Sequence, residues 1–400
     1  MRPSLLAPAR RWLPLLLSLT VGLAACGGGS SDDDDDDSID FITAFGVLGQ
    51  SNYTSGSANR GSTVSAAGLA QPLGSIASNG QLFYVADYGN HRVLGYNAIP
   101  SSLGAAADFV IGQTTATSNS PGTGATQLAL PASVAVADGK MVVADAGNNR
   151  VLIWNTLPTG NTAPDVVLGQ GDFTGSDPGT AADKLSFPIF AAIANNKLFV
   201  SDQNNNRVLI WNTVPTVSGT AADVVLGQQG FTTATPNDEE DGLNIPAGLW
   251  TDGFRLMVAD SGNNRVMFYS QVPRVNGADA TFVIGQTDFS RVTAGVGQTA
   301  LRTPYGVASD GTRIYIADSG NNRVLKFDAF PIANAPSAVD VYGQDRDDFT
   351  ARTANVDDED EDSDSETANG PLSSPTGVTF FNGVLYVLDR NNHRVLFFPG

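Results

Sequence analysis

The seven residues Asp-Ala-Gly-Asn-Asn-Arg-Val at 145–151 occur in closely related form six times along this chain of 400 residues. The copies at 260–266 and 318–324 keep the pattern Asp-x-Gly-Asn-Asn-Arg-Val, and variants stand at 87–93, 202–208 and 389–395. Successive copies begin 58, 57, 58, 58 and 71 residues apart. A fixed period of this size is typical of a repeat fold, in which each copy supplies one structural unit.

Two other markers recur with the same period. One is a Gly-Gln pair that follows an apolar run, and the other is a Leu-x-x-Pro segment further along the chain. The Gly-Gln pairs begin at 49, 112, 169, 227, 285 and 343, and the Leu-x-x-Pro segments begin at 69, 128, 185, 243, 301 and 372. The three markers together predict that residues 39–400 are one repeat domain.

Each unit has the pattern of four β-strands. In one unit we expect strands at 305–308, 313–317 and 323–327, and a fourth that carries Gly343-Gln344. The first two strands are separated by a pair such as Asp138-Gly139, which is a strong signal for a two-residue hairpin with positive φ at both positions. The equivalent pairs are 79–80, 195–196, 252–253, 310–311 and 382–383. Six four-stranded units predict an all-β, six-bladed β-propeller.

The order of the markers also predicts how the ring closes. The first Gly-Gln strand, at 39–50, precedes the first Leu-x-x-Pro, whereas the last unit ends on its third strand, at 394–398. We therefore expect the N-terminal strand to supply the outer strand of the last blade, which removes an exposed sheet edge.

A known repeat has this pattern. Leu-x-x-Pro, followed by Phe-Tyr-Val-Ala-Asp at 83–87 and Asn-His-Arg-Val at 90–93, resembles the NHL repeat, and 385–389 with 392–395 is nearly as close. The resemblance covers roughly residues 39–400 and implies an NHL-type six-bladed propeller. Enzymes, scaffolds and nucleic-acid binders all use this fold, so the fold alone does not identify the function.

The N-terminal residues resemble an export signal. Three arginines precede an apolar run at 13–25 that is too short to span a bilayer. Leu-Ala-Ala-Cys at 23–26 resembles the lipobox of bacterial lipoproteins, which implies acylation of Cys26, the only cysteine of the chain. We predict a signal peptide at 1–25, a flexible acidic tether at 26–38 and a location on the bacterial cell envelope, with Gly27 favouring the outer membrane.

The most regular charged feature is an Asp and an Arg five residues apart in every unit. Because a feature repeated in all blades is more typical of scaffold than of site, we interpret these residues as structural pairs. The alternative is a ring of charge that binds a ligand on the axis. The pairs are Asp87 and Arg92, Asp145 and Arg150, Asp202 and Arg207, Asp260 and Arg265, Asp318 and Arg323, and Asp389 and Arg394.

Two acidic loops interrupt the repeat, and together with the tether they carry most of the net charge of −19. They are either solvated loops that keep the protein soluble or candidate binding loops for calcium or a cationic partner. The acidic balance disfavours nucleic acid as a partner. The candidate residues are Asp238, Glu239, Glu240 and Asp241 in the first loop, and Asp357, Asp358, Glu359 and Asp360 in the second.

The only histidines, His91 and His393, occupy equivalent positions in the first and last units. Two ligands make a poor zinc site without further cysteine or carboxylate partners, and neither histidine stands in a catalytic motif. We therefore predict no metal and no cofactor. Metal-dependent lyases and lactonases resemble this family, but the first strands here, such as 132–136 and 247–250, offer small and apolar residues.

These observations favour an interaction scaffold that binds another protein of the cell envelope. A carbohydrate or small-ligand binder, and a metal-dependent lyase- or lactonase-like enzyme, are the alternatives. The connections that follow Gly-Gln should lie on the same face as the Asp-x-Gly-Asn-Asn-Arg loops. We expect this face, the long-loop face, to carry every long connection and to bind the partner. These connections are 51–68, 114–127, 171–184, 229–242, 287–300 and 345–371.

Overall fold

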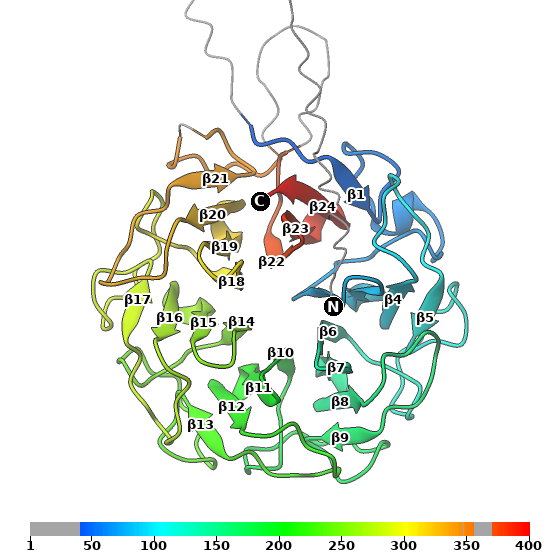
Figure 1. Ribbon diagram of the computed structural model, residues 1–400, viewed down its shortest axis with the longest axis horizontal. Helices are drawn as coiled ribbons and strands as arrows, with labels where there is room; N and C mark the ends of the chain where they lie inside the picture. The colour runs from blue at the N-terminus through cyan, green and yellow to red at the C-terminus, as the bar shows by residue number, and fades with distance from the viewer. Residues whose placement is uncertain (1–40, 347, 356–369) are drawn as a thin grey trace, which may run out of the picture. The chain divides into compact units, whose positions relative to one another are not determined.

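The computed structural model describes residues 41–346, 348–355 and 370–400. Within the compact unit Ile39–Gly400, these residues form six four-stranded antiparallel sheets around a central axis (Figure 1). The chain is therefore an all-β, six-bladed propeller, and the fold class predicted from the repeat period is confirmed. Each blade runs from an inner first strand to an outer fourth strand.

The blades follow one another along the chain. The first consists of β2 (Ile76–Ser78), β3 (Phe83–Asp87), β4 (Arg92–Tyr96) and β5 (Phe109–Ile111). The second consists of β6 (Pro131–Ala137), β7 (Lys140–Asp145), β8 (Arg150–Trp154) and β9 (Val166–Leu168). The third consists of β10 (Pro188–Ala194), β11 (Lys197–Asp202), β12 (Arg207–Trp211) and β13 (Val224–Leu226).

The fourth blade consists of β14 (Pro246–Thr251), β15 (Leu256–Asp260), β16 (Arg265–Tyr269) and β17 (Phe282–Ile284). The fifth consists of β18 (Pro304–Ser309), β19 (Ile314–Asp318), β20 (Arg323–Phe327) and β21 (Asp340–Tyr342). The sixth consists of β22 (Pro375–Phe381), β23 (Val384–Asp389), β24 (Arg394–Pro399) and β1 (Gly46–Leu48). Each fourth strand ends one residue before its Gly-Gln pair, whose glycine has positive φ and starts a turn.

The core of the ring lies between neighbouring blades. All five residues of β8 and all five of β12 are buried, because each blade is covered on both faces by its neighbours. Apolar side chains on both faces of such a strand are removed from water, which stabilises the fold. These strands are therefore nearly continuous runs of Val, Leu, Ile and Trp. The six blades thus depend on one another for burial.

The turns between first and second strands have two forms. The pairs 138–139, 195–196 and 382–383 connect their strands directly and have positive φ at both residues, as predicted. In the other three blades the prediction is wrong, because two more residues separate the strands and only the glycine has positive φ. There the Asn or Asp side chain accepts two backbone N–H bonds, as Asp252 does from Phe254 and Arg255. An Asx turn therefore replaces the two-residue turn.

Long connections occur on both faces of the ring, not on one face as predicted. Those between third and fourth strands leave from the face of the short hairpins, which we call the hairpin face. They run along the outer edge of the preceding blade, where Gly219 N–H donates to the Val167 carbonyl at 2.9 Å. Covering an outer strand in this way shields an edge that could pair with another chain. These connections are 97–108, 155–165, 212–223, 270–281 and 328–339.

The ring closes through its N-terminal strand, which confirms the predicted closure. β1 pairs antiparallel with β24, with Val47 opposite Leu396 and Leu48 opposite Val395. The bond from Phe45 N–H to the Phe397 carbonyl, at 2.8 Å, extends the ladder. Leu48 is fully buried, so the last blade is completed by a strand from the other end of the domain.

Our first prediction compares Leu48 with Leu168, the equivalent and equally buried residue of β9. If β1 is a full member of its blade, Leu48→Ala should lower stability as much as Leu168→Ala does. A buried Leu→Ala change costs about 2–5 kcal/mol. Urea unfolding of the two variants measures both costs. An unchanged midpoint for Leu48→Ala beside a lowered one for Leu168→Ala would contradict the closure.

Candidate functional site: the loops of the long-loop face and the axial channel

The repeated loop is a 3-10 turn built around a buried carboxylate. In the third blade the turn is Gln203–Asn205, and Asp202 precedes it. One Asp202 oxygen accepts from Arg207 Nε and Asn205 Nδ2, both at 2.7 Å, and the other accepts from Ser186 N–H at 2.6 Å. The same three bonds occur in all six blades, with Asp–Arg distances of 2.7 or 2.8 Å.

Each of these arginines also fastens two long connections to the ring. Arg207 donates to the carbonyls of Thr180, Ala181 and Lys184, which precede its own blade. It donates as well to Phe231 of the following connection, at 2.6 Å. The six sequence-predicted pairs thus lie apart from one another, one in each blade, and organise the main chain of the long-loop face.

Burial sets the electrostatics of the pairs. Removal from water raises the pKa of the Asp260 carboxyl to about 6, although Arg265 and three hydrogen-bond donors oppose the shift. Burial likewise raises the pKa of the other five carboxyls, again opposed by the neighbouring arginine. A buried ion pair is retained only when its remaining polar atoms are also bonded, and that condition is met here.

A further bond links each loop to the next blade. Asn149, the fifth residue of its loop, is left-handed and its Oδ1 accepts from Phe187 N–H at 2.7 Å. Phe187 itself has positive φ, which is strained for a residue of this kind. The equivalent bond recurs around the ring, so every blade holds a strained residue of its successor.

The two histidines take the place of asparagine in this interaction. Nδ1 of His91 accepts from Leu130 N–H at 3.0 Å, and Nδ1 of His393 accepts from Gln71 N–H at 2.8 Å. Accepting at Nδ1 requires the neutral ring, and burial lowers the pKa of both imidazoles. Among the described residues no group of three or more His, Cys, Asp and Glu is placed to hold a metal ion.

Our second prediction concerns pH. Because the folded pKa of each histidine is lowered, the stability that these bonds contribute is complete above the unfolded pKa of about 6.5 and is lost as pH falls below it. Replacing both residues (His91→Asn and His393→Asn) restores the acceptor used in the other four blades. The double variant should match the native protein at pH 7.5 and be more stable at pH 5.5.

Thermal unfolding at both pH values tests this. The six buried carboxyls are common to the two proteins, so the difference between the curves isolates the histidines. The interpretation is wrong if the native protein and the double variant lose stability equally between pH 7.5 and 5.5.

The first acidic loop lies on the long-loop face with its main chain tied down. Arg265 donates to the carbonyls of Asp238 and Glu239, and Ala280 N–H donates to that of Glu240. The side chains of these three acidic residues are exposed, whereas Asp241 is half-buried and accepts from Gln229 and Asn237. The second loop, with Asp357, Asp358, Glu359 and Asp360, lies outside the described residues.

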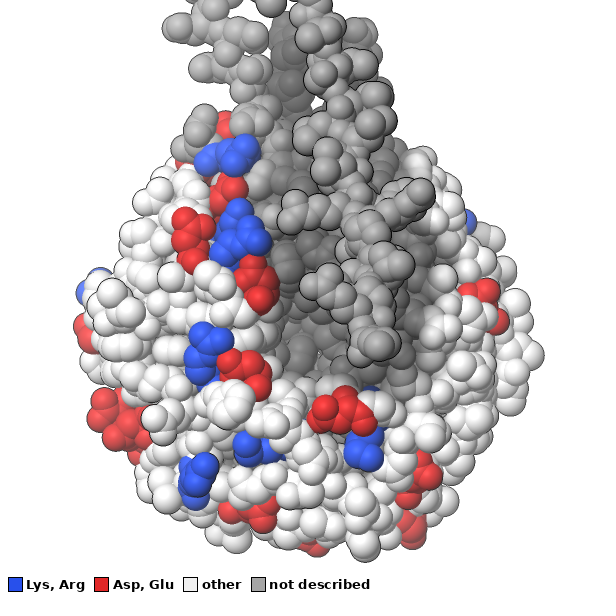
Figure 2. All heavy atoms as spheres, viewed as in Figure 1, with Lys and Arg blue, Asp and Glu red and all other residues white. Residues whose placement is uncertain are grey.

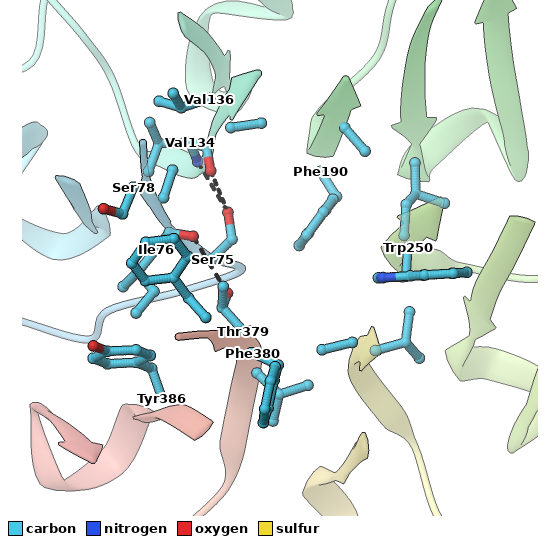
Figure 3. A pocket seen from close by; sticks show the side chains of 18 of the residues that line it. Ser75, Ile76, Ser78, Val134, Val136, Phe190, Trp250, Thr379, Phe380 and Tyr386 are labelled. Carbon is cyan, nitrogen blue, oxygen red and sulfur yellow. Dashed lines mark hydrogen bonds between the residues drawn. The ribbon is translucent and has the colours of Figure 1, made fainter. Parts of the chain in front are cut away.

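The central channel contains an apolar cavity of about 260 Å³ at its hairpin end, which we call the axial cavity. All six first strands line it, with Trp250, Phe190 and Phe380 among the largest side chains (Figure 3). Two of its hydroxyls are engaged between blades: Ser75 Oγ donates to the Val134 carbonyl and accepts from Val134 N–H, and Thr379 Oγ1 donates to the Ile76 carbonyl. The walls therefore favour an apolar ligand.

The opposite end of the channel carries a group of polar side chains that sequence reasoning missed. Tyr88, Gln203, Tyr305 and Arg390 come from four different blades and are half-buried; we call them the axial cluster. Gln203 of the third blade acts to lower the pKa of the Tyr305 phenol of the fifth, so these two side chains lie close together. Three members occupy the second position of the repeated loop, where their departure from Ala or Ser was the available signal.

A family model of the NHL repeat matches residues 372–398, which contain β22, β23 and most of β24. The chain is a six-bladed β-propeller with an NHL repeat in its last blade. No characterised protein of similar sequence was found for it.

Several solved structures are similar to this propeller in fold. The aldose sugar dehydrogenase of Streptomyces coelicolor in its PQQ-bound form has a TM-score of 0.46 and 16% identity, over 84% of this chain and 96% of that chain. The structure of streptogramin B lyase has a TM-score of 0.41 and 13% identity, over 85% of this chain and 95% of that chain. The WD40 β-propeller domain of Doa1 has a TM-score of 0.44 and 9% identity, over 81% of this chain and 77% of that chain. Similarities this distant carry no information on function.

Proposed function

We propose that this NHL propeller is a binding scaffold of the bacterial cell envelope and that its partner, another envelope protein, docks on the long-loop face. The observation that supports this proposal most is the set of buried arginines, which fix the connections of that face in place. A surface whose loops are already ordered loses little conformational entropy when a partner binds. Rigid elements with ordered loops are therefore well suited to recognition.

The charge of the face indicates the chemistry of the partner. Asp238, Glu239 and Glu240 project exposed carboxylates from a main chain that is held by hydrogen bonds. These three carboxylates follow one another in one loop. On the face seen in Figure 2, by contrast, basic side chains lie beside acidic ones. We expect these three exposed carboxylates to contact basic groups of the partner, and calcium is a second candidate for the same carboxylates.

The third prediction tests this contact. Changing Asp238→Asn, Glu239→Gln and Glu240→Gln removes three charges and leaves the backbone bonds intact, so folding should be unaffected. Capture of the partner by cross-linking in intact cells should weaken, and more so at low salt, where charge contributes most. The matched comparison is Glu240→Gln against Asp328→Asn, an exposed carboxylate at the start of a connection on the hairpin face.

The quantity to compare is the amount of partner captured by Glu240→Gln and by Asp328→Asn; capture by one variant alone does not decide between the faces. If Asp328→Asn weakens capture as much as Glu240→Gln does, or if the triple variant captures normally, the long-loop face is the wrong face.

The anchor is the other half of the proposal. Residues 1–40, including Cys26, lie outside the described residues. In the part of the chain that the structure does describe, no helix has the length and hydrophobicity of a membrane span. We propose that the protein is held by acylation of Cys26, which follows the lipobox-like residues 23–25.

The fourth prediction is that Cys26→Ser moves the protein from the membrane fraction to the soluble fraction, because lipid attachment then has no acceptor. Fractionation in high salt and alkali measures the change, with Ser30→Ala in the same segment as a control. Continued membrane attachment of Cys26→Ser under those conditions would rule the anchor out.

A second candidate function is the binding of a small apolar ligand in the axial cavity. The cavity favours it, because its aromatic and aliphatic walls come from all six blades. At its margin Arg255 lies over the ring of Phe330, 3.7 Å from the centroid, and near Trp250. Quenching of tryptophan fluorescence by an apolar probe, lost in Trp250→Ala, would support this alternative; no quenching would exclude it.

A further inference from the structure

The second position of the repeated loop separates scaffold residues from residues with another role. In three blades it is small, and where it is serine it supports the ring: Ser261 and Ser319 donate to the carbonyls of Pro304 and Pro375 of the next blade. The other three blades have large polar side chains, which the repeat does not need for folding. The six residues are Tyr88, Ala146, Gln203, Ser261, Ser319 and Arg390.

The three large residues meet on the axis. The Arg390 guanidinium lies 6.0 Å from the centre of the Tyr88 ring, and Gln203 lies close to Tyr305. Tyr305 is itself a departure, because it follows a proline where the other blades have Leu, Ala, Ile or Thr. Burial raises the pKa of the Tyr305 phenol, so both tyrosines of the cluster present neutral hydroxyls. All four side chains lie at the end of the channel that opens on the long-loop face.

Arg390 differs from the buried arginines of the six repeated pairs. Those arginines have a carboxylate at 2.7 or 2.8 Å and several carbonyl acceptors. No ion pair or side-chain hydrogen bond of Arg390 occurs within the described residues, and its Nε is buried without an acceptor. A buried donor without an acceptor is uncommon and needs an explanation.

Within the described residues, no ion pair compensates the charge of Arg390. Asp389, the acidic residue next to Arg390 in the chain, is already bonded to Arg394, Asn392 and Ser373. Asp87 and Asp202, which precede Tyr88 and Gln203, are bonded in the same way to Arg92 and Arg207. The axial cluster therefore combines one positive charge with two phenols and an amide, which are all able to donate hydrogen bonds.

We propose that the axial cluster binds a carboxylate group that reaches the axis from the long-loop face, with Arg390 as its main ligand. A planar guanidinium matches the two oxygens of a carboxylate, and such charge-assisted pairs are stronger than neutral hydrogen bonds. The inference deepens the proposed function, because it assigns this carboxylate to the docking partner. The acidic residues Asp238, Glu239 and Glu240 would then contact the partner's basic groups, while the axial cluster binds its carboxylate.

Small probes test the assignment with the full chain and without the partner, so it can fail while the long-loop proposal stands. Titration calorimetry at constant ionic strength compares an N-acetylated tripeptide with a free C-terminal carboxylate, the same peptide as an amide, acetate and inorganic phosphate. The peptide acid should bind and the amide should not. Arg390→Ser, which gives this blade the residue found at 261 and 319, should fold normally and bind the acid at least about tenfold more weakly.

The matched control is Arg302→Gln, because Arg302 also has a buried Nε without an acceptor but is not part of the cluster. It should bind the peptide acid normally. Equal binding of acid and amide, no binding of either, or equal losses in Arg302→Gln and Arg390→Ser would each overturn the proposal. If inorganic phosphate binds more tightly than the peptide acid, the site is a phosphate site and the carboxylate proposal is wrong. If acetate binds and the peptide acid does not, the ligand is a free small acid and not a group of the docking partner.

Discussion

The buried Asp–Arg pair is the interaction on which the rest of this propeller depends. Without its partner, either charge would remain in a site removed from water, at a cost of about 3–5 kcal/mol. Net domain stability is only about 5–15 kcal/mol, so the loss of even one pair is serious. The same guanidinium then bonds carbonyls before and after its blade, as Arg150 does with Gln127 and Phe173. The Asp–Arg pair thus links the second and third strands of a blade, the turn between them and two long connections.

Repetition made much of this architecture readable from the sequence. The period, the four strands of a unit and the closure by β1 all follow from markers that recur in every blade. The form of the hairpins did not follow, because Asn79 and Asn382 precede glycine alike and only the length of the connection separates an Asx turn from a two-residue turn. The connections that cover outer edges were missed, although an apolar residue followed by proline stands at the third and fourth positions of each, as at Ile99-Pro100 and Leu157-Pro158.

The candidate site was harder to predict for a related reason. Patterns reveal what is shared, whereas the axial cluster consists of positions where blades differ. Arg390 and Tyr88 are far apart in sequence, and only closure of the ring between the sixth and first blades places them together. His91 and His393 show the opposite case, because they look exceptional in sequence and yet do what Asn does in the other blades. In a ring of repeats, each residue is best judged against its five equivalents.

The closure also has a mechanical consequence. Five outer strands continue without a break from the third strand of their own blade, whereas β1 is joined to β24 only through side-by-side pairing. Tension on the chain ahead of Phe45 therefore enters the ring at a seam of three residue pairs. Under load this seam would open before any other blade is pulled apart, because it is the outer-strand junction that the chain itself does not bridge.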